Sequence, residues 1–399
     1  MFEYKFYFKI YLSFLFVLTV YYVTAMHDET SNSMAEWVIN YQGGFTRRGF
    51  LGEIMFQLSL LFDIELRRVF GTLQIVIYLL YFYFIYQFFK NIKSHFIFSL
   101  AIFSPIFFLF SLAELEALGR KDILLFLVFL VNFIIYEKFR NINFNYIYFL
   151  LTFPIVFLTH EIYIIYTPYL LIFFLLIEKN INFSVCIKIL GLFFYIIFFI
   201  FLINNVNFSA DNLNLLCKNL LEKTGESCGL APHSMVVNLA GYRSEVGWQP
   251  LHIFRYIMFF LVGSGALISL IVYSEFNKNK NNFIINKLSF RFIFLLLMIP
   301  SILPFLTAVD SGRYLSMAYT FPCIFFFSCY KYNLININFN KMKIKYKFLI
   351  PKNKNFLILI LIIICFTWSP KAVYHEDTAS IPIYRLITKI PHFFINFKN

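Results

Sequence analysis

The sequence predicts an all-α, polytopic integral membrane protein, and three observations carry this prediction. Of its 399 residues, 60% are hydrophobic and only 14% are charged, which is more apolar surface than a water-soluble core could bury. Many apolar runs reach about 20 residues, the length that a helix needs to cross a hydrocarbon core of roughly 30 Å. The sequence lacks the alternation of apolar and polar residues that marks a transmembrane β-strand.

About eleven membrane-spanning helices can be placed on these apolar runs, within a single membrane domain over residues 1–399. The first run follows Lys5 and Lys9. It is long and aromatic and has no small-residue cleavage site, so we expect it to remain as an anchor with the N-terminus in the cytoplasm. The predicted spans are residues 6–26, 69–89, 96–112, 123–136, 146–159, 162–177, 185–203, 251–273, 290–308, 314–330 and 356–368.

The lysines of the predicted loops indicate which side of the membrane is the cytoplasm. Cytoplasmic loops carry an excess of lysine and arginine. With eleven spans, the segment 331–355 becomes a basic cytoplasmic loop on the side of the N-terminus. The same side receives the short loops that carry Lys90, Lys93, Lys138, Lys179, Lys278, Lys280 and Lys287. The other side then receives the C-terminus, the outer loops 27–68 and 204–250, and an outer tail 369–399.

Arginines are more informative than lysines in this chain. The abundance of Phe, Ile, Asn and Lys indicates nucleotide bias, which makes Lys the default cation, so an Arg more often has a specific role. Several arginines fall in the predicted outer loops, where the positive-inside rule does not account for them. This one-sided distribution is the best functional clue in the sequence.

The most distinctive outer segment is residues 41–53, YQGGFTRRGFLGE. Its glycines allow backbone N–H groups to approach a ligand, and we expect Thr46 to cap a helix whose first turn holds Arg47 and Arg48. A helix N-terminus with two guanidinium groups suits phosphate or pyrophosphate. Apolar residues at helical spacing behind it predict an amphipathic helix in the membrane interface. The alternative is that both arginines only bind lipid headgroups.

The stretch 146–177 is predicted to hold a second candidate site. As a single helix of roughly 32 residues it would run near 48 Å, far beyond the hydrocarbon core, so we expect two short spans that meet at His160 and Glu161. Ionisable groups at membrane depth are functional candidates. Burial would lower the pKa of His160 and raise that of Glu161, which makes either residue a candidate general base.

Further arginines lie beside carboxylates in the predicted outer loops. Arg120 belongs to a charged turn at residues 114–122, where a mutual ion-pair network and an anion site both remain open. Asp310 and Arg313 are three residues apart at the start of a late span. They can therefore pair with each other, or Arg313 can face a ligand while Asp310 orients it. Arg243, in the loop 204–250, is a candidate of lower rank.

Cysteine spacing says less about function. Cys217 and Cys228 share the loop 204–250, where an oxidising compartment could join them, and the sequence leaves this disulfide open. The other cysteines lie in or beside spans and fit as small apolar fillers. No zinc-type spacing, nucleotide-binding loop or dinucleotide fingerprint occurs, so we expect no metal, no cofactor and no nucleic-acid partner.

The outer arginines, the long loop between middle spans, the basic inner face and the Gly312-Arg313-Tyr314 start of a late helix together resemble bacterial surface-polysaccharide polymerases, the Wzy-type O-antigen and capsule polymerases. The resemblance covers the whole chain as architecture, but only residues 43–53 and 310–314 as local pattern. Asp28 and Glu29 are similar in position to the catalytic carboxylate of related membrane glycosyltransferases that use polyprenyl-linked sugars. The alternative for these two acids is the solvated start of a loop.

The resemblance implies a multi-pass protein of the bacterial plasma membrane that transfers or polymerises glycans carried on undecaprenyl pyrophosphate at the outer leaflet. Its partners would be the polyprenyl-linked glycan, membrane lipids and other polysaccharide-assembly proteins. Arg47, Arg48 and Arg313 would hold the pyrophosphate, with His160 and Glu161 near the reacting hydroxyl. The main alternative is a flippase for lipid-linked glycans or another transporter, which would favour charges on both faces and an internal repeat. An acyltransferase is a third reading.

Overall fold

The computed structural model is mostly helical and describes residues 4–25, 35–92, 95–114, 116–178, 182–233, 235–236, 250–277, 287–307, 310–345, 353–372 and 379–382. Among these residues, five helices are long and apolar enough to cross a membrane, as a multi-pass membrane protein requires. They are α1 (Tyr4–Ala25), α4 (Leu66–Phe89), α8 (Ile142–Thr159), α10 (Phe183–Asn204) and α14 (Pro250–Val272).

Shorter elements complete the bundle. The other helices are α3 (Phe50–Phe62), α5 (Phe96–Ile102), α6 (Phe110–Ala113), α7 (Asp122–Phe139), the 3₁₀ helix η1 (Glu161–Tyr166), α9 (Thr167–Ile177), α11 (Ala210–Thr224), α12 (Leu230–His233), α16 (Phe290–Met298), the 3₁₀ helix η2 (Ile299–Ile302), α17 (Leu303–Thr307), α18 (Ser311–Lys331), α19 (Phe339–Lys345) and α20 (Lys354–Phe366). Two antiparallel strand pairs join β1 (Ser274–Phe276) to β2 (Ile335–Ile337) and β3 (Ser369–Pro370) to β4 (Ala379–Ser380).

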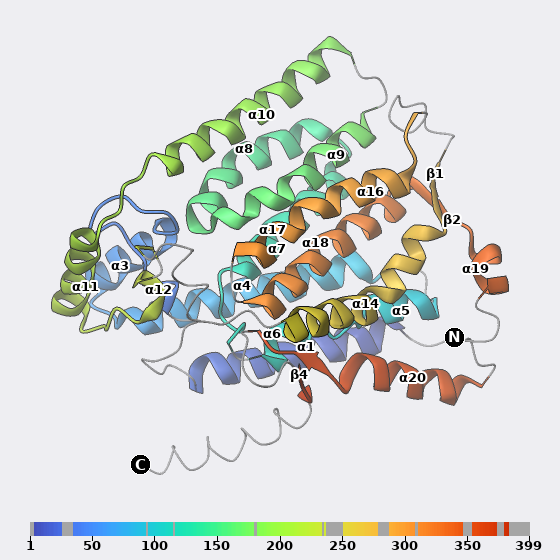
Figure 1. The fold of residues 1–399 in the computed structure, drawn as a ribbon, viewed down its shortest axis with the longest axis horizontal. Coiled ribbons are helices and arrows are strands. Elements are labelled where there is room, and N and C mark those ends of the chain that lie inside the picture. Colours follow the sequence, from blue (N-terminus) through green and yellow to red (C-terminus); the bar gives the residue numbers. More distant parts are fainter. Residues whose placement is uncertain are drawn as a thin grey trace.

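The long helices lie roughly alongside one another, and the small elements gather at the two ends of the bundle (Figure 1). Helices α3, α11 and α12 lie at one end, while α19 and the β1–β2 pair lie at the other. Helix α4 packs against α1 and α7, and α7 packs in turn against α8 and α18. Helix α18 is buried from Gly312 to Cys329, so protein rather than lipid surrounds it. This enclosure explains how α18 tolerates several Ser, Thr and Tyr residues.

Helix α10 is the opposite case. It lies at the edge of the bundle and contacts α8 (Figure 1). Only 11% of its most apolar 18-residue stretch is buried. The side chains of Phe194, Phe198 and Phe201 are 65%, 56% and 67% exposed. A helix that is apolar all round and leaves such side chains uncovered suits contact with lipid chains.

Prolines interrupt several predicted spans. The predicted helix over residues 96–112 is wrong as a continuous element, because α5 ends at Ile102, a turn that contains Pro105 follows, and α6 begins only at Phe110. The segment 290–308 likewise changes to the 3₁₀ helix η2 around Pro300. The expected break between two short helices at residues 159–161 is present: α8 ends at Thr159, and η1 and α9 follow His160.

The helix expected within residues 27–68 is α3, but its start differs from the prediction. Thr46 does not cap it; Gly49 precedes its first residue and makes no side-chain cap. Arg47 and Arg48 therefore lie in the loop before the helix, and the backbone of Arg48 is left-handed, with φ +67°. Such a φ is uncommon outside glycine and costs about 1–2 kcal/mol, so other contacts must hold it.

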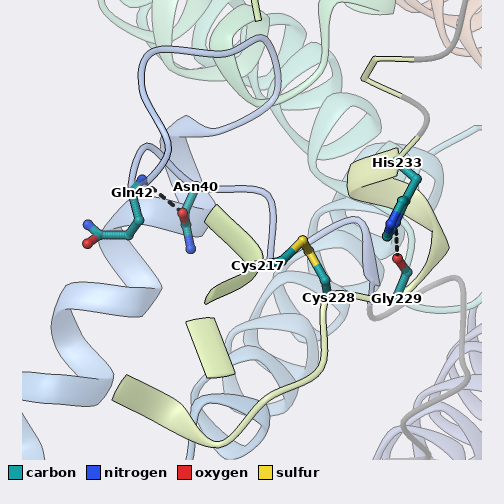
Figure 2. Close-up of a disulfide and its surroundings, with 6 residues drawn as sticks. All are labelled: Asn40, Gln42, Cys217, Cys228, Gly229 and His233. Carbon is teal, nitrogen blue, oxygen red and sulfur yellow. Dashed lines mark hydrogen bonds between the residues drawn. A yellow bond between two sulfur atoms is a disulfide. The ribbon is translucent and has the colours of Figure 1, made fainter. Parts of the chain in front are cut away.

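The loop 204–250 contains α11, and a disulfide joins Cys217 of that helix to Cys228 (Figure 2). Figure 2 shows this bond beside the segment that carries Asn40 and Gln42, where the amide N–H of Gln42 donates to Asn40 Oδ1 at 3.0 Å. In the same view, the ring of His233 meets the carbonyl of Gly229 at 2.8 Å. The disulfide thus closes a short hairpin against the loop before α3.

Candidate functional site

Charged side chains from five separate segments meet at the end of the bundle where α7 and α18 begin and α8 ends. They come from the segments on either side of residue 40, the N-terminal turn of α7, the junction of α8 with η1, and the start of α18. We call this set the charge cluster. It consists of Glu36, Arg47, Arg48, Arg120, Lys121, Asp122, His160, Glu161, Asp310 and Arg313.

Arg313 is the centre of the buried half of the cluster. Its Nε and Nη2 donate to the two carboxylate oxygens of Asp122, the second at 2.8 Å. Its Nη1 donates to Glu36 Oε1 at 3.0 Å and to Asp310 Oδ2 at 3.1 Å, and Nη2 also lies 2.8 Å from His160 Nε2. Only 3% of the Arg313 side chain is exposed. Of the two alternatives for Asp310 and Arg313, the pairing is present, within a larger network.

Arg120 shares Glu36 with Arg313. Its Nη1 donates to Glu36 Oε1 at 2.5 Å, its Nε donates to the carbonyl of Glu116 at 2.8 Å, and its Nη2 lies 4.0 Å from Asp310 Oδ2. Burial raises the pKa of Glu36, but the positive charges of Arg120 and Arg313 outweigh burial and hold that pKa well below its usual range. The ion-pair network expected within the charged turn at residues 114–122 takes a different form, because Arg120 and Asp122 pair with Glu36 and Arg313 of other segments. An anion site at Arg120 stays a prediction.

Arg48 and Glu161 form the other half of the cluster. Arg48 Nε donates to both oxygens of Glu161, at 3.0 and 2.8 Å, and Nη2 donates at 2.7 Å. Arg47 Nη1 lies 3.7 Å from the same carboxylate. The expectation of a raised pKa for Glu161 is wrong. Burial acts in that direction, but the charge and hydrogen bonds of Arg48 and the charge of Arg47 lower the pKa far below its usual value.

His160 joins the two halves of the cluster. A guanidinium group only donates hydrogen bonds, so His160 Nε2 accepts from Arg313, and the Ile162 amide N–H faces the other ring nitrogen, His160 Nδ1, at 3.5 Å. That nitrogen lies 3.8 Å from Glu161 Oε2. Burial and the positive charges of Arg48 and Arg313 lower the pKa of His160 well below its usual value, in the expected direction. The ring is therefore neutral near pH 7.

Lys121 holds the strained backbone of Arg48 in place. Its Nζ donates to the carbonyl of Arg48 at 2.7 Å, and the residue is fully buried. Burial lowers the pKa of Lys121 to about 7, although the negative charge of Glu36 acts in the opposite direction. This contact explains how a non-glycine residue keeps a left-handed conformation next to the candidate site.

The turn before α7 is fixed from two sides. The carbonyl of Gly119 accepts hydrogen bonds from Trp37 Nε1 at 2.6 Å and from Gln74 Nε2 of α4 at 3.1 Å. Gly119 has φ +76°, a conformation that favours glycine, and an added Cβ would lie 3.0 Å from Gln74 Oε1. The positions of Arg120, Lys121 and Asp122 therefore follow from contacts with buried neighbours on both sides.

Helix α11 fastens the loop that leads to Arg47 and Arg48. Asn212 Nδ2 donates to the carbonyl of Gly43 at 2.6 Å, and Asn219 Nδ2 donates to the carbonyl of Gln42 at 3.1 Å. The approach requires a glycine, because a Cβ on Gly43 would lie 2.0 Å from the carbonyl oxygen of Asn212. From the other side, Glu53 of α3 accepts hydrogen bonds from the Tyr41 amide and the Gln42 side chain, both at 2.9 Å.

The exposure of the cluster is graded. The Arg313 and Arg120 side chains are 3% and 8% exposed, whereas those of Arg48, Glu161 and Arg47 are 21%, 23% and 38% exposed. An incoming molecule can therefore reach the Arg47–Arg48–Glu161 edge, while carboxylates already surround Arg120 and Arg313. This edge combines two guanidinium groups with a carboxylate, which can bind an anion and accept a proton.

Three of the candidates named from the sequence, Asp28, Glu29 and Arg243, lie outside the described residues.

Glu114, in the charged turn before α7, contacts the segment after α20. It accepts hydrogen bonds from the Ala372 amide at 3.2 Å and the Ser380 hydroxyl at 2.7 Å.

Sequence reasoning did not identify the roles of Glu36 and Asp122. Both were visible only as acids in predicted outer loops, and their partners are distant in the sequence. The signal that could have found them is charge balance. An arginine that is buried needs a carboxylate partner, and where its own loop supplies none, the partner must come from another loop. In the described part of the chain, no group of three His, Cys, Asp or Glu side chains could hold a metal ion.

Comparisons with known proteins do not assign the chain to a family. No protein-family model matches the chain, and no curated protein or solved structure matches it.

Proposed function

We propose that the chain is a membrane glycosyltransferase that transfers or polymerises glycans carried on a polyprenyl pyrophosphate, similar to the bacterial surface-polysaccharide polymerases. The observation that supports this most directly is the Arg47–Arg48–Glu161 edge, where two guanidinium groups and a carboxylate meet at the accessible side of a buried network. A pyrophosphate leaving group needs fixed positive charge, and an attacking hydroxyl needs a proton acceptor.

The proposed topology has eleven spans, a cytoplasmic N-terminus and the charge cluster at the outer leaflet of the bacterial plasma membrane. The placement of lysines supports it. At the end of the bundle opposite the cluster, Lys331 closes α18 and donates to the carbonyl of Phe88 at 2.9 Å and to Glu137 at 2.7 Å. The lysine-rich segment 331–355 follows directly. By the positive-inside rule this end faces the cytoplasm, and the cluster then lies outside.

The reaction follows from the chemistry of these groups. The acceptor hydroxyl oxygen attacks the anomeric carbon of the donor glycan, and the bond from that carbon to the pyrophosphate oxygen breaks. The hydroxyl proton passes to the Glu161 carboxylate, and the electron pair of the broken bond stays on the pyrophosphate. Arg47 and Arg48 stabilise the charge that develops on this leaving group.

In the structure, Glu161 is held by the same guanidinium groups that would bind the donor. A pyrophosphate that binds Arg47 and Arg48 competes with this carboxylate. Because Arg48 is the main group that lowers the pKa of Glu161, loss of that contact raises the pKa toward the range of a useful base. Donor binding and activation of the base would then be coupled.

The test is the length of the surface polysaccharide in a strain whose own copy of the gene is deleted and replaced by variants. Arg48→Ala and Glu161→Gln should give only short or single repeating units at wild-type protein levels. Arg68→Ala is the matched control, because the Arg68 side chain is 72% exposed and pairs with Glu65 on the surface of α4. Wild-type chain lengths in both cluster variants would exclude the proposal.

The same strains separate transfer from transport. If the chain is a transferase, the Glu161→Gln strain accumulates lipid-linked repeating units on the outer leaflet, where an added glycosidase reaches them. If these units accumulate only on the inner leaflet, the chain acts in transport and the proposed reaction is wrong.

A further inference from the structure

A cavity of about 380 Å³ lies beside the Arg47–Arg48–Glu161 edge, between the loop before α3 and the connection from α10 to α11. This volume falls within the range of small-molecule sites. Arg47 belongs to both places, because its guanidinium lines the cavity and lies 3.7 Å from Glu161. The lining residues are Thr46, Arg47, Ile203, Asn204, Val206, Asn207, Phe208, Ser209 and Met235.

Thr46 is the first indication that a ligand belongs here. The residue is 1% exposed, and its hydroxyl oxygen is buried without a hydrogen-bond partner. Buried hydroxyl groups are normally paired, and an unpaired one destabilises the fold. Thr46 does not serve as the helix cap that its position suggests. A ligand in the cavity that accepts a hydrogen bond would satisfy this group.

The charge of Arg47 indicates which kind of ligand fits. Its side chain is the most exposed of the charge cluster, and its contact with Glu161 is longer than the three hydrogen bonds from Arg48. The guanidinium therefore has donors left for a second partner on the cavity side. Asn204 and Asn207 add neutral polar residues to the lining. This set suits a phosphate group.

Part of the lining is apolar and continues onto the lipid-facing helix α10. Ile203, Val206, Phe208 and Met235 line the cavity, and Ile203 belongs to the end of α10. Two and five residues earlier on that helix, Phe201 and Phe198 are more than half exposed. A ligand in this place has a phosphate beside Arg47 and Thr46 and an apolar chain that can follow α10 into the membrane. A free phosphate ion would leave the apolar wall unused.

We infer that this cavity binds the phosphate-bearing headgroup of a membrane lipid, with Arg47 and Thr46 as its recognition residues. As the entry site of a polyprenyl-linked donor it rests on the proposed function, but binding can be measured without any turnover. The position of Arg47 then gives the lipid a defined path, from the membrane along α10, through the cavity, to the carboxylate of Glu161.

Binding is tested with the full-length protein in nanodiscs of neutral lipid, with undecaprenyl phosphate, undecaprenol and inorganic phosphate as probes. The wild type should bind undecaprenyl phosphate at least about tenfold more tightly than either other probe, because only this probe can contact both the charged and the apolar lining residues. Arg47→Gln and Thr46→Val should each weaken its binding about tenfold or more, as expected for lost hydrogen bonds to a charged group. Thr46→Ser should keep wild-type binding, and Arg68→Gln is the control for charge.

A second readout does not depend on affinity. Thr46→Val removes an unpaired buried hydroxyl, so the variant without ligand should melt at the same temperature as the wild type or higher, while the rise in melting temperature on adding undecaprenyl phosphate should be lost. Wild-type affinity in both Arg47→Gln and Thr46→Val would overturn the inference. Equal binding of inorganic phosphate would overturn the lipid assignment. If lipid binding depends on both residues but the protein shows no glycosyl transfer, the binding site stands and the proposed function is wrong.

Discussion

Arg313 and Asp122 lie 191 residues apart in the sequence, and the guanidinium of the first binds both oxygens of the second. The pair joins the first turns of α18 and α7 inside the protein. Breaking a buried ion pair on one side leaves an uncompensated charge, which costs more than the pair itself contributes.

We expect Arg313→Met to lower the free energy of unfolding by about 3–5 kcal/mol, because Asp122, Glu36 and Asp310 would lose their shared partner. Thermal unfolding of the purified protein in detergent measures this. Adding Asp122→Leu to the variant should recover part of the loss. Arg291→Met is the control. The Arg291 side chain is 52% exposed, and its pair with Glu275 is a long surface contact, with 3.7 Å between Nη2 and Oε1. Equal melting temperatures for Arg313→Met and the control would contradict the role of Arg313.

Stability should rise with pH between about 7 and 9 because of Lys121. The pKa of this buried amine is about 7 in the native protein, against an ordinary value of 10.5, so in this window the unfolded chain binds a proton that the native protein lacks. The slope from this group is at most about 1.4 kcal/mol per pH unit. Melting temperatures at pH 7, 8 and 9 check it.

Lys121→Met should flatten this rise, whereas Lys218→Met, at a side chain 68% exposed, should leave it unchanged. His160 acts in the same direction at lower pH. Its lowered pKa means that acid protonates the unfolded chain first, so stability falls as the pH drops below the ordinary value of 6.5. A melting temperature that falls between pH 7 and 9 in the wild type would contradict the lowered pKa of Lys121.

Reduction of the Cys217–Cys228 disulfide should destabilise the hairpin that holds the site loop. A crosslink that closes a short loop of about 15 residues contributes roughly 3 kcal/mol through the unfolded chain, and these cysteines are 11 residues apart. We expect a reductant and Cys217→Ser to lower the melting temperature to the same extent, with no further effect of reductant on the variant. Cys186→Ser, at an exposed free cysteine, should behave as the wild type in both conditions.

Gly43→Ala should separate α11 from the loop before α3. The new methyl group would lie 2.0 Å from the carbonyl oxygen of Asn212, so one of the two segments must move. Overpacking of this kind costs about 1–3 kcal/mol. Faster proteolysis within α11 would report the movement. Gly191→Ala is the matched control, because a Cβ at Gly191 meets nothing within 4 Å, and unchanged cleavage in both variants would remove α11 as a support of the site.

The helices of this fold could be predicted because their signal is local. A run of about 20 apolar residues has few alternatives to a membrane-spanning helix, and the break at His160 follows from the length of the stretch around it. The break after Ile102 was missed because apolar composition alone does not reveal it; Pro105 is the only local sign. The start of α3 was misplaced because Thr46, a good capping residue, lines a cavity instead.

Most residues of the candidate site could be predicted, but the ion pairs between them could not. Arg48, Arg120, His160, Glu161 and Arg313 were named because charged residues are rare and conspicuous in an apolar chain. Which carboxylate each arginine binds depends on how α7, α8 and α18 pack, and sequence spacing carries no information on that. The same dependence explains the reversed pKa of Glu161: burial could be foreseen, but its contact with Arg48 could not.

The distribution of the charge cluster along the chain has a consequence for biogenesis. Asp122 emerges from the ribosome long before Arg313, the cation that binds both of its carboxylate oxygens. Glu36, in contrast, can pair with Arg120 earlier in synthesis. Until the last third of the polypeptide has been inserted, Asp122 lacks its arginine partner and must stay hydrated or protonated. A nascent fragment that stops short of Arg313 therefore carries an acid that it cannot bury.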